Sequence, residues 1–299
     1  MIKNVHIPVL QNEVLKYLNP KPNENFIDCT VGEGGHSTII LEKNQPNGKV
    51  LGIEIDPELY QKLKSETAGM PSRFILVNDS YINLKQIIEK YKFGSVSGIL
   101  FDLGLSSWQL EKSGRGFSFQ REEPLDMRYN PETTRLTAEK IINEFSEKDI
   151  EEILKNYGEE KFSEKISKEI IEARKKTPIK TTFQLVGIIK RTVPQNYEKG
   201  RIHPATRAFQ ALRIAVNDEI ENFKKALPKV LEILEEGGRL VIISFHSLED
   251  RIAKVFLKET TKNGLLEILT KKPVIPSKEE IKINPRSRSA KLRAAIKIK

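Results

Sequence analysis

The sequence predicts an α/β fold: a doubly wound parallel sheet with an inserted all-helical domain. Short runs rich in Val, Ile, Leu and Phe alternate with segments of helical periodicity in the first third of the chain. Strands that are buried on both faces and separated by helices pair in parallel, through right-handed crossovers. The alternation stops after Leu103 and an apolar run returns only at residues 239–245, so we expect the residues between them to form a helical insertion.

The first four strands are expected in the first third of the chain, at residues 25–30, 49–56, 74–79 and 96–103. The segments STIILEK and PELYQKLKSE between them have helical periodicity. The stretch 104–136 is rich in Gly, Ser, Arg and Pro with interleaved aromatic residues. A loop of this length in a compact protein is usually functional or disordered.

Helices are predicted between residue 137 and the strand at residues 239–245. The pattern is helical over residues 137–192 and 204–236, and Gly237 and Gly238 form a helix stop signal. Segments 265–270 and 294–299 are expected to supply the last strands as an antiparallel edge pair. The chain should therefore contain a sheet domain, 1–109 with 213–299, and an inserted helical domain, 110–212.

The charge pattern favours a polyanionic partner. The 299 residues have a net charge of +9. Residues 174–213 contain ten Lys or Arg against one acid, and residues 286–299 contain six basic residues and no acid. Such clusters are typical of nucleic-acid-binding proteins, although solvated helix faces and a frayed tail would give the same pattern.

The composition argues against several other classes of protein. Cys29 is the only cysteine, which excludes an internal disulfide, and the four histidines do not have metal-ligand spacing, so no metal is expected. No apolar run has the length of a membrane span, and the first residues lack a signal-peptide pattern. We expect a cytoplasmic protein that does not enter a membrane.

A glycine-rich turn after the first strand predicts a nucleoside cofactor. The run Asp28-Cys29-Thr30-Val31-Gly32-Glu33-Gly34-Gly35-His36 leads into a helix, and glycines there let a ligand approach the backbone and the free N–H groups. The second strand ends in Glu54-Ile55-Asp56, and an acid about twenty residues after the turn can accept hydrogen bonds from ribose hydroxyls. A purely structural turn would also need glycine.

The spacing of the glycines favours S-adenosylmethionine over a nicotinamide dinucleotide. The turn reads G-x-G-G and lacks the third glycine of the dinucleotide motif. In adenosylmethionine folds an acid at the position of Asp28 orients the amino-acid moiety, and one at the position of Asp79 lies near the adenine. Both residues could instead cap loop backbone. An NAD-dependent oxidoreductase remains the alternative enzyme.

Asp102 and His246 are the candidate catalytic residues. Asp102 ends the fourth strand, at the edge where open α/β sheets bind ligands. An exocyclic amine on a base is a weak nucleophile, and a carboxylate that accepts its N–H would activate it and take the proton. Asp102 could equally hold the cofactor's ammonium group. His246 follows the fifth strand and could act as a general base or have a structural role. Phe245 or Phe119 could stack on the target nucleobase.

Seven long motifs in order resemble those of the bacterial RsmH (MraW) family of methyltransferases. They are CTVGEGGHS, GIEIDP, FDLGLSSWQL, RGFSFQREEPLDMRY, HPATRAFQALRIAVNDE, VIISFHSLEDR and NPRSRSAKLR, and the resemblance extends from His6 to Arg293. It implies a class I S-adenosylmethionine-dependent methyltransferase with a Rossmann-like sheet. It also implies methylation of N4 of a cytidine in the decoding region of 16S ribosomal RNA.

The resemblance also implies which residues bind the cofactor. These are Gly34, Gly35, His36, Asp56, Tyr81, Asp102 and Gln109. Tyr81 stands where phenylalanine is commoner in the family, which keeps an aromatic ring for the adenine. Trp108 replaces a common proline, so the path of the loop before Gln109 is less certain.

The expected partner is 16S ribosomal RNA or the small ribosomal subunit, bound by a monomer or weak homodimer. The inserted domain should recognise the substrate, with the arginine-rich loop 114–129 as a clamp on a flipped-out base. The candidate RNA-binding residues are Arg115, Phe119, Arg174, Lys175, Lys190, Arg191, Arg201, Arg207, Arg286 and Arg288. A non-catalytic RNA-binding protein with a vestigial cofactor fold is the alternative, and the acids at positions 28, 56, 79 and 102 argue against it.

Overall fold

The computed structural model describes residues 8–197 and 202–299. His6, Ile7 and the candidate Arg201 lie outside these ranges. The chain divides into two compact units, Met1–Gly104 with Ile220–Lys299 and Leu105–Glu219. The junctions predicted from the sequence lie after residues 109 and 212.

The first unit is built on a seven-stranded sheet in the order β3-β2-β1-β4-β5-β7-β6. Its strands are β1 Phe26–Asp28, β2 Val50–Glu54, β3 Phe74–Asn78, β4 Val96–Asp102, β5 Leu234–Ser244, β6 Leu266–Ile268 and β7 Lys291–Lys297. Strands β1 to β5 are parallel, and β7 pairs antiparallel with both β5 and β6. The predicted α/β fold class is confirmed, and so is the antiparallel pair at the edge.

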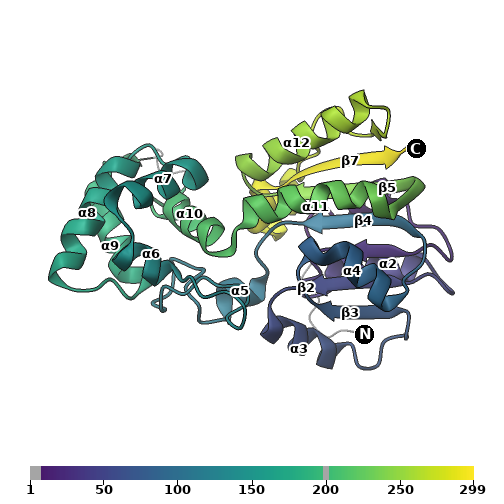
Figure 1. Cartoon of the computed structure of the whole chain (residues 1–299), viewed down its shortest axis with the longest axis horizontal. Helices are drawn as coiled ribbons and strands as arrows, with labels where there is room; N and C mark the ends of the chain where they lie inside the picture. The colour runs from purple at the N-terminus through teal and green to yellow at the C-terminus, as the bar shows by residue number, and fades with distance from the viewer. Residues whose placement is uncertain (1–7, 198–201) are drawn as a thin grey trace. The chain divides into compact units, whose positions relative to one another are not determined.

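Helices cover both faces of this sheet. They are α1 Gln11–Leu18, α2 Gly35–Lys43, α3 Pro57–Glu66, α4 Leu84–Tyr91, α11 Glu219–Ile233, α12 Ser247–Lys262 and α13 Lys278–Ile283, with short 3₁₀ turns η1 Tyr81–Asn83 and η3 Pro285–Ser289. Apolar residues of α4, α11 and α12 pack on one face, and those of α1 and α2 pack on the other. Figure 1 shows α4 and α11 lying over the strands of the sheet. This layering explains why β1 and β2 are buried along their whole length.

The second unit is helical, as the periodicity predicts. Its helices are α5 Ser107–Glu111, α6 Ala138–Glu144, α7 Glu147–Gly158, α8 Ser163–Lys176, α9 Thr182–Thr192 and α10 Thr206–Asn217. They enclose a hydrophobic core of their own that includes Ile141, Leu154 and Leu212. Figure 1 shows α6 to α10 gathered in one group. No helix in the described parts of the chain is long and apolar enough to span a bilayer.

The prediction of one helix over residues 204–236 is wrong, because this segment forms two helices and the second ends before residue 236. The helix is interrupted at Asp218, which has a left-handed backbone with φ 51°, and α11 ends at Ile233. Leu234 already pairs with Val96, and the register of the β4–β5 ladder shifts between Val96 and Gly98. Gly237, with φ 79°, therefore belongs to an irregular start of β5 and is not a helix stop.

Candidate active site

The glycine turn lies where β1 leads into α2. Gly32 and Gly34 have φ values of 54° and 80°, a left-handed conformation that glycine adopts without steric cost. A Cβ atom on Gly34 would lie 3.0 Å from Cδ1 of Leu63 in α3. The turn therefore brings bare backbone, followed by the free N–H groups of an α-helix, to the carboxyl edge of the sheet.

Asp28 braces this turn. Its side chain is buried, and its two carboxylate oxygens accept hydrogen bonds from the Thr30 backbone N–H at 3.2 Å and the Ser37 hydroxyl at 2.8 Å. Burial raises the pKa of this carboxyl, and the neighbouring His36 opposes that shift. These bonds fit a structural role for Asp28, in which its carboxylate holds the backbone of the loop.

The acid that faces the glycine turn from β2 is Glu54, not Asp56. Asp56 is fully buried and caps α3, because its carboxylate accepts hydrogen bonds from the N–H groups of Glu58 at 3.1 Å and Leu59 at 3.4 Å. Glu54 is the last residue of β2, and its Oε2 accepts a hydrogen bond from the Gly32 N–H at 3.1 Å. The ribose-binding role expected for Asp56 therefore does not fit its contacts.

Burial also changes the chemistry of Glu54. Its side chain is 6% exposed, and this desolvation raises the pKa of its carboxyl to about 8, although it accepts hydrogen bonds from the N–H groups of Asp56 and Gly32. The signal that could have identified Glu54 is its position as the last residue of the apolar run, where a side chain leaves the strand towards the loop.

Asp79 and Tyr81 follow β3. One oxygen of Asp79 accepts hydrogen bonds from the Ser80 N–H at 2.7 Å and the Asn83 side-chain amide at 2.8 Å, so this acid organises the loop. Tyr81 is half-buried and packs edge to face on Phe101 of β4, with ring centroids 5.6 Å apart. An aromatic ring is thus held at the carboxyl edge of the sheet, where adenine packing was predicted.

Asp102 and His36 lie side by side at the end of β4 and the start of α2. Asp102 Oδ2 is 3.6 Å from His36 Nε2, and the Asp102 N–H donates to the Thr30 hydroxyl at 2.7 Å. Among the described residues, no hydrogen-bond partner exists for Asp102 Oδ1 or for either ring nitrogen of His36, although all three atoms are buried. Buried polar atoms are normally paired, so this site has the polar groups needed to hold a charged ligand.

His246 caps α12. Its Nδ1 accepts a hydrogen bond from the Glu249 N–H at 3.4 Å, and its Nε2 lies 3.0 Å from Glu249 Oε1 in an arrangement that does not meet hydrogen-bond geometry. The Glu249 carboxylate in turn accepts a hydrogen bond from the Phe245 N–H at 2.8 Å. One ring nitrogen of His246 takes part in the helix cap and the other lies beside a carboxylate. His246 therefore fits a structural role better than the role of a general base.

Gln109 belongs to the second unit and caps α5. Its side-chain oxygen accepts a hydrogen bond from the Ser106 N–H at 3.0 Å, and its own N–H donates to the Ser106 hydroxyl at 3.1 Å. The cofactor contact implied for Gln109 stays a prediction.

Arg115 is not a surface cation, contrary to the prediction that it binds RNA. It is 7% exposed, and its Nη1 donates to the backbone carbonyls of Arg128 and Tyr129, both at 2.9 Å. It thereby cross-links the loop 114–129 from inside. Phe119 in the same loop stacks on His203, with ring centroids 4.5 Å apart, so one face of Phe119 is already covered.

The remaining predicted RNA-binding residues differ in their availability. Arg174 and Arg207 are half-buried, and each donates to a backbone carbonyl, of Ile142 at 2.8 Å and of Glu159 at 2.7 Å. The exposed cations are Lys175, Lys190, Arg191, Arg286 and Arg288. The positive surface is therefore smaller than the count of basic residues suggested.

The sheet order, the glycine turn and the polar atoms at one sheet edge define a class I methyltransferase that uses S-adenosylmethionine. The sequence pattern of the MraW methylase family matches residues 3–298, and the chain belongs to that family. A protein of *Persephonella marina* named ribosomal RNA small subunit methyltransferase H is 46% identical over 98% of this chain and 99% of its own length.

A second relative and a solved structure also match this chain over nearly its whole length. A protein of the same name from a *Sulfurihydrogenibium* species is 47% identical over 98% of this chain and 99% of its own. The solved structure of an rRNA methylase from *Streptococcus thermophilus* is 12% identical, with a TM-score of 0.45, over 100% of this chain and 99% of that one.

Proposed function

We propose that this protein methylates N4 of a cytidine in the decoding region of 16S ribosomal RNA, in the cytoplasm. The observation that carries the proposal is the buried, unpartnered carboxylate oxygen of Asp102 beside His36, in a chain of a methylase family. The names of the relatives support ribosomal RNA of the small subunit as the substrate class.

The cofactor is held by residues of the first unit along the carboxyl edge of the sheet. We assign the backbone of Gly34, Gly35 and His36 to the amino-acid moiety and Tyr81 to the adenine, as the resemblance implies. Glu54 takes the ribose-binding role in place of Asp56, because it ends β2 and contacts the glycine turn. When bound, S-adenosylmethionine supplies an electrophilic methyl group.

Asp102 performs the acid–base part of the reaction. The lone pair of an exocyclic amine is delocalised into the base, and a carboxylate that accepts one N–H makes the nitrogen more nucleophilic. The amine must lose a proton when it gains a methyl group, and the Asp102 carboxylate, whose Oδ1 has no hydrogen-bond partner among the described residues, accepts it. The side chain of Asp102 is 23% exposed, which lets the proton pass on to solvent. The same residue orients the amine for in-line attack.

Methyl transfer from labelled S-adenosylmethionine to small subunits that lack the modification tests this proposal. The expected product after digestion is N4-methylcytidine. Label on another base would show that the target is wrong, and no label on any RNA or particle would favour the non-catalytic binding protein. Calorimetry addresses the oxidoreductase alternative, since binding of NAD without binding of S-adenosylhomocysteine would support that class.

A further inference from the structure

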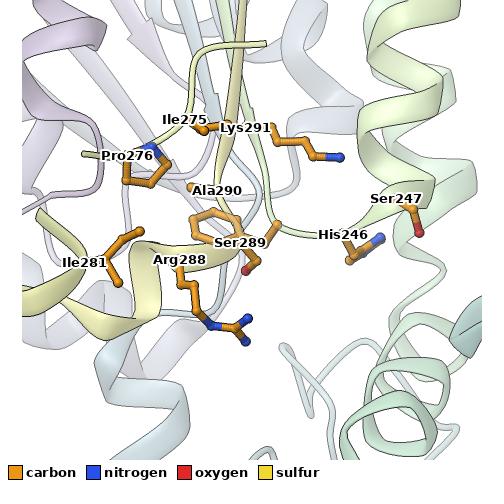
Figure 2. A pocket seen from close by; sticks show the side chains of 10 residues that line it. His246, Ser247, Ile275, Pro276, Ile281, Arg288, Ser289, Ala290 and Lys291 are labelled. Carbon is orange, nitrogen blue, oxygen red and sulfur yellow. The ribbon is translucent and has the colours of Figure 1, made fainter. Parts of the chain in front are cut away.

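A hollow is lined entirely by residues of the first unit. Its volume is about 300 Å³, and its walls include Phe245, Pro276, Ile281, Arg288 and Lys291. Figure 2 shows Pro276 and Ile281 on the opposite side of the hollow from His246. The proposed chemistry uses none of these side chains.

Phe245 connects this hollow to the segment that follows β4. Phe245 lines the hollow, and a Cβ atom on Gly104 would lie 2.7 Å from Phe245 Cε2, so the ring packs directly on the Gly104 backbone. Gly104 comes two residues after Asp102, and Asp102 pairs with Ile243 across the β4–β5 ladder. This packing places the hollow beside the segment that follows Asp102 in the chain.

The lining of the hollow combines an apolar wall with cations. Ile275 is 65% exposed, and it lies with Pro276 and Ile281 on the lining. Arg288 and Lys291 also line the hollow, and none of the described residues in its lining is an acid. Apolar surface beside positive charge suits a nucleotide, whose base or ribose packs on the wall while its phosphate meets the cations.

The two cations differ in their availability to an anion. Arg288 is exposed and has no ion-pair partner among the described residues. Lys291 Nζ donates a hydrogen bond to Asp250 Oδ2 at 3.4 Å, and Arg293 binds the same carboxylate more closely, with its Nε 2.7 Å from Oδ1. Lys291 is 40% exposed and keeps a face towards solvent.

The walls are held in place by backbone contacts. Val274 and Leu292 exchange two backbone hydrogen bonds, of 2.9 and 2.8 Å, which fix the segment before Pro276 against β7. Glu280 of α13 accepts a hydrogen bond from the Leu10 N–H at 2.7 Å. The hollow is therefore formed before any ligand binds, which lowers the entropic cost of binding.

We propose that this hollow binds the nucleotide adjacent to the target cytidine, with its phosphate at Arg288 and Lys291 and its base or ribose on the wall of Ile275, Pro276 and Ile281. The inference rests on the proposed function and adds a subsite to it. The subsite would let the enzyme bind the RNA strand next to the base that is methylated.

Kinetics with small subunits that lack the modification provide the first test. Arg288→Gln should raise KM for the subunits at least about tenfold and lower the slope of log KM against log salt by about one, because one phosphate contact is lost. The value of kcat and the affinity for S-adenosylhomocysteine should not change. Lys282→Gln is the matched control, because Lys282 is exposed on α13 but does not line the hollow.

Crosslinking provides the second test and does not depend on kinetics. A photoreactive phenylalanine analogue at position 275 should crosslink to a nucleotide next to the target, whereas the same analogue at position 283 should not. Ile283 is the control because it is 71% exposed and lies outside the lining. Equal crosslinking at both positions, a crosslink to distant nucleotides or to a second protein chain, or an unchanged KM for Arg288→Gln would overturn the subsite. Absence of methyl transfer by the unaltered protein would instead overturn the proposed function.

Discussion

Replacing Asp102 by asparagine separates the two roles that this residue could have. The substitution keeps the size of the side chain and removes its charge. Because Asp102 Oδ1 has no hydrogen-bond partner among the described residues, no protein contact is lost at that atom. The other oxygen is 3.6 Å from His36 Nε2, too far for a strong hydrogen bond. We therefore expect the free energy of unfolding to change by less than about 1 kcal/mol.

The effect on catalysis should be much larger. An asparagine oxygen can still accept the amine N–H, but it cannot take the proton. General acid–base catalysis contributes about 10²–10⁴-fold, so kcat at saturating cofactor should fall by this factor, which is a rise of about 2.7–5.4 kcal/mol in the activation free energy. The Kd for S-adenosylhomocysteine should rise by less than about threefold, since a lost charge-assisted hydrogen bond would cost more than tenfold.

Single-turnover methyl transfer and calorimetry with S-adenosylhomocysteine measure the two quantities. Glu66→Gln is the control, because it removes one surface carboxylate from α3, where Glu66 pairs with Lys62 at 3.1 Å. A variant Asp102→Asn that bound cofactor weakly but kept its kcat at saturation would refute the proton-acceptor role. Asp102 would then hold the cofactor's ammonium group.

Three further predictions follow from burial, backbone geometry and charge. The raised pKa of Glu54, about 8, means that the folded protein holds a proton that the unfolded chain releases above its usual pKa near 4.5. Stability from this group is full below pH 4.5 and is lost as the pH rises through 8, so urea unfolding should show about 4 kcal/mol less stability at pH 9 than at pH 5 from Glu54, and Glu54→Gln should remove that difference. Gly34→Ala should destabilise the fold by about 1–2 kcal/mol and weaken cofactor binding, because φ is 80° and Leu63 lies 3.0 Å from the new Cβ. Gly69→Ala, with no atom within 4 Å of its Cβ, should do neither, and equal thermal shifts for both variants would contradict the assignment. Neutralising the exposed Lys190 and Arg191 as glutamine should lower the salt slope of RNA binding by about 1.4–1.8, and a slope equal to that of the surface variant Lys224→Gln would remove them from the interface.

The architecture of the sheet could be predicted because its signal is local. The apolar runs at β1, β2, β3 and β4 are short, continuous and bounded by polar loops, and parallel pairing follows from the helices between them. The start of β5 could not be predicted in this way. Residues 231–236 have a helical pattern, but the pairing of Leu234 with Val96 outweighs that local preference.

The site residues were harder to predict because the sequence does not show where a side chain's hydrogen bonds are made. Glu54 and Asp56 are two residues apart, and only their contacts show that Asp56 caps α3 while Glu54 contacts Gly32. Arg115 lies in a polar, glycine-rich segment typical of an exposed loop, yet the carbonyls of Arg128 and Tyr129 draw it inside. Long-range backbone acceptors of this kind leave no pattern in the sequence.

Mass mapping of modified nucleotides in 16S ribosomal RNA tests the central claim most directly, in cells that lack this protein and in cells complemented with the native chain or with Asp102→Asn. We predict that one cytidine of the decoding region loses its N4 methyl group in the deficient cells, and that the native chain restores it while Asp102→Asn does not. A cytidine that stays fully methylated in cells without the protein would contradict the account.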